Sequence, residues 1–157
     1  MANMDSYVTK GKSDVQDKLQ KATQDVEKMG RDFQETKNGL SGMPGGLDSD
    51  ILSMINDARE QGKAEAEADI EGVKSSAVAD AKSSADSIKT DVTQKINDNT
   101  TAKNKMSGIS SKYGKAAIER ASSALDQNTA KGNQLMSVLE NALREADTTI
   151  AGVKDSL

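Results

Sequence analysis

Acidic side chains between residues 65 and 71 are the first candidates for chemistry in this 157-residue chain. Glu65, Glu67, Asp69 and Glu71 stand at alternate positions, and carboxylates that converge can bind a hard cation such as Ca²⁺. On a helix, residues two apart do not face each other. We therefore expect a solvated helix face here, without a metal site and without paired carboxylates for acid–base catalysis.

The residue types that most catalytic sites need are missing. The chain has no His and no Cys, which removes the commonest general base, the commonest metal ligand and all thiol chemistry. Four glycines between Asn38 and Leu47 lack the Lys-Ser/Thr pair of a phosphate-binding loop, so they indicate a turn. We expect the seven methionines to fill helix contacts rather than form a separate binding stripe. The sequence predicts no enzyme and no cofactor.

Composition indicates the elements available to hold any functional surface. Hydrophobic residues make up 34% of the chain and aromatic residues 2%, which is too little for a large globular core but sufficient for narrow helical contacts. A single proline leaves long stretches free to be helical. We predict an all-α fold, either an elongated antiparallel helical hairpin or a three-helix coiled-coil bundle, forming one domain over residues 1–157.

A heptad row of apolar residues predicts the first helix, at about residues 4–37. The row opens at Val8 and advances mainly by four and three, which is typical of a left-handed coiled coil. Lys12 occupies one position of the row, and Gly11 and Gly30 are expected to weaken it. The residues expected to pack in this helix are Val15, Leu19, Val26, Met29 and Phe33.

Glycines and the only proline end this helix and reverse the chain, which predicts a hairpin loop at residues 38–48. Asp48 is placed to cap the next helix, and Leu47 and Leu52 stand at the spacing of a hydrophobic staple. The loop residues singled out are Leu40, Met43, Pro44 and Gly45.

An eleven-residue repeat of small and apolar residues predicts the second helix, at about residues 49–98. Residues 97–101, Asn-Asp-Asn-Thr-Thr, favour caps and turns and predict a second reversal. A third helix is then expected at about residues 101–156. The packing residues expected in the second and third helices are Ile55, Ile70, Val73, Ile88, Val92, Leu135, Leu139, Ile150 and Val153.

Charge bears on partners and on helix pairing. A net charge of −4 disfavours nucleic acid, because phosphates would be repelled. Residues 49–98 carry 11 acidic and 6 basic side chains, whereas residues 99–157 carry 6 and 8, so antiparallel packing of these segments is favoured. No apolar run approaches the length of a membrane span. The N-terminus lacks the profile of a signal peptide, so we expect a cytoplasmic protein or one secreted by a signal-peptide-independent route.

The loop carries a resemblance to a known family. Leu40-Ser-Gly-Met43-Pro-Gly45, followed by Leu47 and an amphipathic helix that opens at Ile51, resembles the Leu-x-x-Trp-x-Gly turn of the small helical-hairpin proteins of type VII secretion. Met43 stands at the Trp position and Gly45 at the Gly position, and the match spans roughly residues 8–97. The remaining helix resembles the extension of helical partner proteins of the longer, toxin-bearing relatives.

The resemblance implies a non-enzymatic role. Its export signal is Tyr-x-x-x-Asp/Glu, but Tyr7 is followed at the fourth place by Gly11 and Tyr113 by Ala117. A chain of this kind is implied to depend on a partner for export or to act as its chaperone, by packing beside the partner's N-terminal helical domain.

Three functions remain open from the sequence. The first is a helical interaction protein that pairs with another helical protein or with itself, as a homo- or hetero-oligomer. The second is an amphipathic lipid-surface or stress-protective protein, which the small alanine face disfavours because alanine buries little area in lipid. The third is a structural filament or spacer element.

Overall fold

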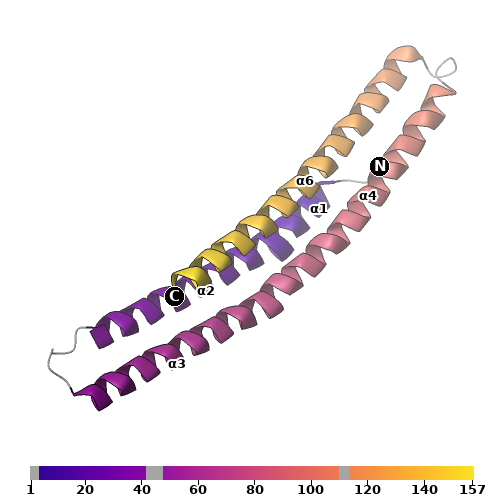
Figure 1. Ribbon diagram of the computed structural model, residues 1–157. Coiled ribbons are helices and arrows are strands. Elements are labelled where there is room, and N and C mark those ends of the chain that lie inside the picture. The colour runs from indigo at the N-terminus through magenta and orange to yellow at the C-terminus, as the bar shows by residue number, and fades with distance from the viewer. Residues whose placement is uncertain (1–3, 42–47, 110–113) are drawn as a thin grey trace. The chain divides into compact units, whose positions relative to one another are not determined.

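The computed structural model describes residues 4–41, 48–109 and 114–157, and these residues are helical almost throughout (Figure 1). No strand occurs in these three ranges, so the predicted all-α fold class is confirmed. The elements, in chain order, are α1 (Asp5–Lys10), the π-helical segment η1 (Gly11–Gln16), α2 (Asp17–Ser41), α3 (Ser49–Val73), the π-helical segment η2 (Lys74–Val78), α4 (Ala79–Ser107) and α6 (Lys115–Ser156).

Contacts divide the chain into two compact units, whereas the sequence predicts one domain over residues 1–157. Unit 1 comprises Met1–Asp17 and Ala81–Ala142, and unit 2 comprises Lys18–Asp80 and Leu143–Leu157. Unit 1 therefore contains α1, η1, α4 from Ala81 onward and the first part of α6. Unit 2 contains α2 from Lys18 onward, α3, η2 and the last part of α6, so each unit combines two separate segments of the chain.

In unit 1, α4 runs antiparallel to α6. Lys89 Nζ lies 3.1 Å from Glu140 Oε1, and Lys103 Nζ lies 2.8 Å from Asp126 Oδ1, so residue numbers fall along α6 as they rise along α4. Helix α1 runs parallel to α6, because the Met4 backbone N–H donates to Asn128 Oδ1, whereas Gly11, just after α1, lies against Leu135 and Leu139. The core of the unit is aliphatic and small: Met4, Val15, Ala81, Ala85, Ile88, Val92, Leu125, Leu135 and Leu139 are buried.

In unit 2, α2 runs antiparallel to the stretch from α3 to Asp80 at the start of α4, because Lys18 Nζ lies 3.0 Å from Asp80 Oδ2 and a Cβ added at Gly62 would lie 3.7 Å from Phe33 Cε2. Helix α6 contacts α3, since Lys154 Nζ lies 3.7 Å from Glu71 Oε2. These pairs are more than two-fifths exposed, so each contributes only about 0–1 kcal/mol. Burial of Leu19, Ala22, Val26, Phe33, Ile70, Val78, Ala146, Ile150 and Leu157 supplies the main stabilisation.

Glycines permit the closest helix contacts. A Cβ added at Gly132 would lie 2.9 Å from Val92 Cγ1 and 3.0 Å from Met4 Cε. A Cβ added at Gly30 would lie 2.7 Å from Val153 Cγ1. Gly30 therefore allows Val153 of α6 to pack closely against α2, because no side chain intervenes there.

The predicted second reversal at residues 97–101 is wrong. These residues lie within α4, which ends at Ser107, and α6 begins only at Lys115 rather than at about 101. Asn99 is buried and its Nδ2 donates to Thr129 Oγ1 at 3.4 Å. Thr100 Oγ1 donates back to the carbonyl of Ile96. Contact with α6 thus overrides the weak helix propensity of these polar residues.

The predicted start of the first apolar row, at Val8 and Lys12, is also wrong. Gly11 is buried, whereas Lys12 and Val8 are exposed, so the row turns inward one residue earlier than the heptad predicts. The cause is η1, because a π-helical turn carries an extra residue and shifts the phase of the face around it. From Val15 onward the predicted heptad holds.

The predicted loop at residues 38–48 is shorter in the structure. Helix α2 continues to Ser41 instead of ending at about 37, so Leu40 is helical. Asn38 and Gly39 are tolerated there because they lie in the last turns, where helix ends are weakly determined by propensity. Asp48 caps α3 as predicted, since its Oδ1 accepts the Ile51 backbone N–H at 3.0 Å. Within the described ranges, no helix is long and apolar enough to cross a membrane.

Candidate interaction surface

The predicted packing residues lie inside the two units. Ten of the fourteen are buried: Val15, Leu19, Val26, Phe33, Ile70, Ile88, Val92, Leu135, Leu139 and Ile150. The other four are half-buried: Met29, Ile55, Val73 and Val153. The ten buried side chains are covered by helices of the same chain, so a partner cannot reach them while the units stay folded. Any surface for a partner must be built from other residues.

The predicted hairpin-loop residues are placed only in part. Leu40 is half-buried in the last turn of α2. Met43, Pro44 and Gly45 lie outside the described residues.

Two carboxylates of the acidic run on α3 have partners within the same chain. Glu71 pairs with Lys154, and Glu65 accepts a hydrogen bond from Gln61 Nε2. Across the described part of the chain, no group of three acidic side chains is placed to hold a metal ion.

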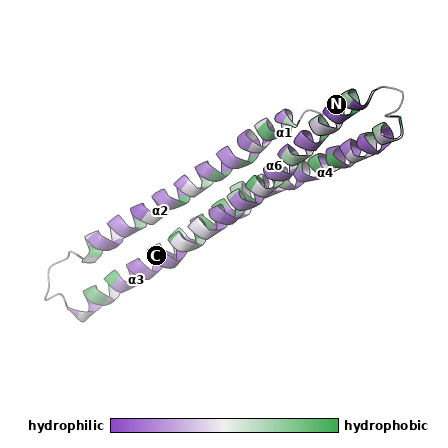
Figure 2. Ribbon diagram, turned by 90° about the horizontal axis from the view of Figure 1, so that it is seen from above, coloured by the Kyte–Doolittle hydropathy of each residue, from purple (hydrophilic) through white to green (hydrophobic). Residues whose placement is uncertain are grey.

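Large apolar side chains are exposed at the start of α3. Ile51 is 41% exposed, Leu52 49% and Met54 69%. Ile51, Met54 and Ala58 stand at i, i+3 and i+7, so they line one face of the helix. Figure 2 shows hydrophobic colour in these first turns. We call Ile51, Leu52, Met54 and Ala58 the α3 stripe.

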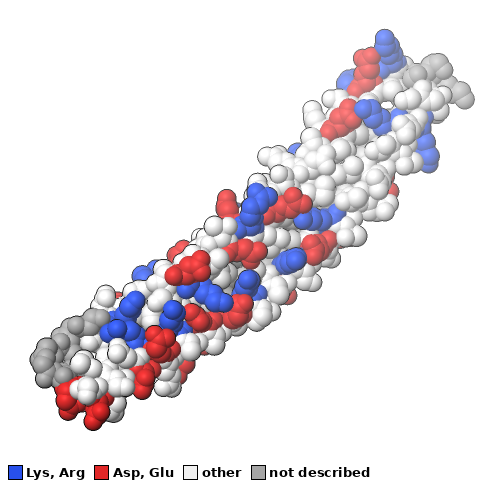
Figure 3. Space-filling view, viewed as in Figure 1, with Lys and Arg blue, Asp and Glu red and all other residues white. Residues whose placement is uncertain are grey.

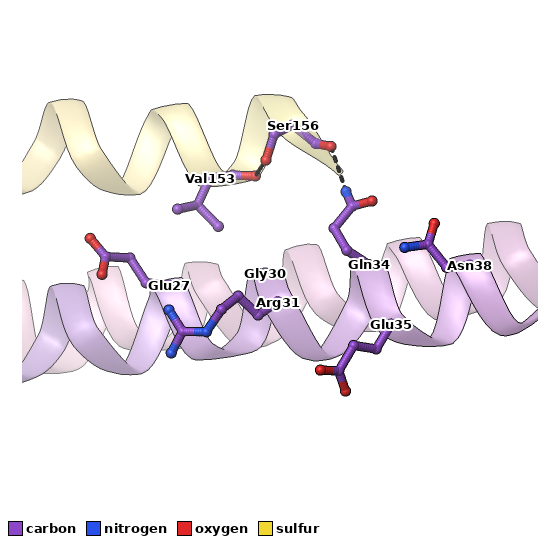
Figure 4. Close-up of a pocket in the computed structure, with 8 residues that line it drawn as sticks. All are labelled: Glu27, Gly30, Arg31, Gln34, Glu35, Asn38, Val153 and Ser156. Carbon is purple, nitrogen blue, oxygen red and sulfur yellow. Dashed lines mark hydrogen bonds between the residues drawn. The ribbon is translucent and has the colours of Figure 1, made fainter.

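The α3 stripe lies past the last described turn of α6. Gln34 Nε2 donates to the carbonyl of Ser156, the last residue of α6, at 2.9 Å (Figure 4). Past Gln34, α2 runs on to Ser41 beside α3, with no third helix among the described residues (Figures 1 and 2). An open depression of about 470 Å³ lies between α2 and the last turn of α6, and no residue of α3 lines it; its lining residues are Glu27, Gly30, Arg31, Gln34, Glu35, Asn38, Val153 and Ser156.

Unit 1 has a comparable two-helix region, where α4 and α6 extend past Met4. A depression of about 480 Å³ lies there, and its lining residues are Lys95, Asp98, Asn99, Ala102, Met106, Ala121 and Leu125. Ile109 is 40% exposed just beyond the end of α4. We call residues 99–109 and 114–126 the α4–α6 end, and residues 35–41 and 48–61 the α2–α3 end.

Arg59, in the α2–α3 end, has an unsatisfied atom. Its Nε is buried and has no hydrogen-bond partner among the described residues. A buried donor without an acceptor costs free energy that an apolar side chain at the same place would not. Arg59 therefore contributes less to stability than its position on the helix allows.

Both two-helix regions have a shape that can bind a helix. Two adjacent helices present ridges and grooves into which another helix packs, and an amphipathic segment can lay its apolar face into such a groove. Sequence reasoning missed the α3 stripe because it assigned Leu52 to a hydrophobic staple and Met54 to the contacts between helices. Ile51 and Met54, which fall outside the repeat that starts at Ile55, were the available signal.

No protein-family model, curated protein or solved structure is detectably similar to this chain.

Proposed function

We propose that this chain is a non-enzymatic interaction protein that binds a helical segment of another chain against the α3 stripe. The observation that carries the proposal is the exposure of Ile51, Leu52 and Met54 beside a helix pair that lacks a third helix in the described residues. Covering those three side chains would remove apolar surface from water at about 25 cal/mol per Å².

In its specific form, the proposal is that the chain acts in type VII secretion. The α3 stripe directly follows the segment that resembles the Leu-x-x-Trp-x-Gly turn. In that setting the chain acts as a secretion partner or chaperone, and it packs beside the N-terminal helical domain of an exported protein.

Co-expression with the helical N-terminal domain encoded by a neighbouring gene tests this function. We expect a complex that survives size-exclusion chromatography with light scattering and that Met54→Asp weakens about tenfold or more, because a carboxylate would be desolvated in the contact. Val8→Asp is the matched control, since Val8 is 43% exposed on α1 and belongs to neither two-helix region.

Equal loss of binding in the two variants would place the contact elsewhere than the α3 stripe. A complex that is unaffected by Met54→Asp would contradict the proposed surface.

A further inference from the structure

The α2–α3 end is acidic as well as apolar. Figure 3 shows Asp and Glu side chains gathered beside the grey residues next to the start of α3. Five carboxylates stand there against two cations: Glu35, Asp48, Asp50, Asp57 and Glu60 against Lys37 and Arg59. An occupant of this surface that is both apolar and basic is therefore favoured over an acidic one.

The α4–α6 end has the opposite character. Its described residues carry four cations against two carboxylates: Lys103, Lys105, Lys115 and Arg120 against Glu119 and Asp126. Apolar surface accompanies the charge, because Ile109 is exposed and Met106, Ile118 and Ala121 are half-buried. This end is also a helix pair with an open depression, so it presents both the charge and the shape that the α2–α3 end requires.

We propose that the α2–α3 end of one copy docks on the α4–α6 end of a second copy, helix pair against helix pair, as a four-helix contact. The inference rests on the proposed function in naming a second copy of this chain as one helical partner of the α3 stripe. The contact is heterologous, because it joins two different surfaces, and every copy carries both. Each added copy leaves one free surface of each kind, so association continues along a row unless it closes into a ring.

The contact is small. Residues 35–41 of α2 and 49–61 of α3 lie beyond or beside the last turn of α6, a length of about 10–18 Å at 1.5 Å per residue. An overlap of this length buries less than the roughly 1,200 Å² of a stable interface. Association is therefore weak, concentration-dependent and sensitive to salt, because the charges at the rim are exposed and screened beyond a Debye length of about 10 Å at 0.1 M.

Charge reversal at one end at a time tests the pairing. The first variant, Asp57→Lys with Glu60→Lys, makes the α2–α3 end basic, and the second, Lys115→Glu with Arg120→Glu, makes the α4–α6 end acidic. All four side chains are exposed, so folding measured by circular dichroism should be unchanged. Asp86→Lys with Asp91→Lys is the control, since it changes the net charge as the first variant does, at exposed positions of α4 outside both ends.

Sedimentation velocity from about 10 μM to 1 mM gives the readout. We expect the wild-type chain and the control to associate with rising concentration, and 0.5 M NaCl to shift this association to about tenfold higher concentration. Each reversed variant alone should stay near its monomer mass of 16.6 kDa, because its two ends then carry the same sign. A mixture of the two variants should associate again, since each reversed end meets a complementary end.

Several results would overturn the proposal. They are a monomeric wild-type chain at every concentration, association of either reversed variant alone at the wild-type level, or a mixture that stays monomeric. Failure here is distinct from failure of the proposed function: a wild-type chain that never self-associates but still binds a foreign helical domain through Met54 retains the function and loses only the second copy as partner.

Discussion

Replacing Gly132 by alanine tests how closely α4 and α6 pack in unit 1. The added Cβ would lie 2.9 Å from Val92 Cγ1, 3.0 Å from Met4 Cε and 3.3 Å from Ile96 Cδ1. Val92 is fully buried and, being β-branched, has one strongly preferred rotamer in a helix, so its Cγ1 cannot turn away. Met4 is flexible and yields more easily.

Two effects of opposite sign decide the outcome. Alanine in a helix interior is favoured over glycine by about 1 kcal/mol, whereas an extra carbon in a packed contact costs about 1–3 kcal/mol. Since a contact of 2.9 Å forces Val92 or the helix backbone to move, we expect the cost to win, with a net loss of about 1 kcal/mol in the free energy of unfolding. Gly152→Ala, on the same helix, meets nothing within 4 Å and should gain about 1 kcal/mol.

Urea unfolding of both variants, followed by circular dichroism at 222 nm, measures the two changes. The midpoint should fall for Gly132→Ala and rise for Gly152→Ala at an unchanged slope. If Gly132→Ala raised the midpoint as much as Gly152→Ala, the helices would not approach at Gly132 as described, and the account of glycine-permitted packing would fail.

Three further changes have defined outcomes. Leu139→Asp should abolish most helicity by circular dichroism, at a cost of about 4 kcal/mol or more, because Leu139 is fully buried; Val138→Asp, at a 37% exposed neighbour, should leave helicity intact. Arg59→Met should keep or raise the melting temperature in calorimetry, since it removes an unsatisfied donor, and a clear fall would contradict that. Asp48→Ala should cost about 1 kcal/mol in urea unfolding by removing the cap on Ile51, whereas Asp48→Asn should cost little.

Periodicity predicted most of the fold because the helices are long and their apolar faces regular. The rows through Leu19, Val26, Val92 and Leu139 lead to buried side chains in the structure. The spacing alone predicted that these residues share a buried face, since residues three and four positions apart lie on one side of a helix, whichever helix packs against that side.

The secondary-structure propensity of short segments gave wrong predictions where contacts between helices determine the local structure. Residues 97–101 read as a turn, but Asn99 is buried against Thr129, about thirty positions away in the chain. No sequence window contains both partners. The phase shift at Gly11 was hidden because the buried position in the π-helical segment is a glycine, which adds no apolar side chain to the row.

Net charge predicted the direction of α4 against α6 but not the ion pairs. Residues 49–98 are the more acidic segment, yet they supply the cation Lys89 that pairs with Glu140. The other pair, Lys103 with Asp126, lies entirely within residues 99–157. The register of one helix against the other determines which side chains meet, and the net charge of a segment does not reveal that register. The α3 stripe was missed because exposure depends on where α6 ends in space.

Hydrogen exchange of the isolated chain at low micromolar concentration, without lipid or partner, tests the central claim that the apolar rows are used up within one chain while the α3 stripe stays open. We expect the slowest amides at Val92, Leu139 and Ile150 and fast exchange at Ile51–Met54. Fast exchange throughout would show that the chain needs a surface or partner to fold. Protection at Ile51–Met54 equal to that of Leu139 would show that the stripe is covered.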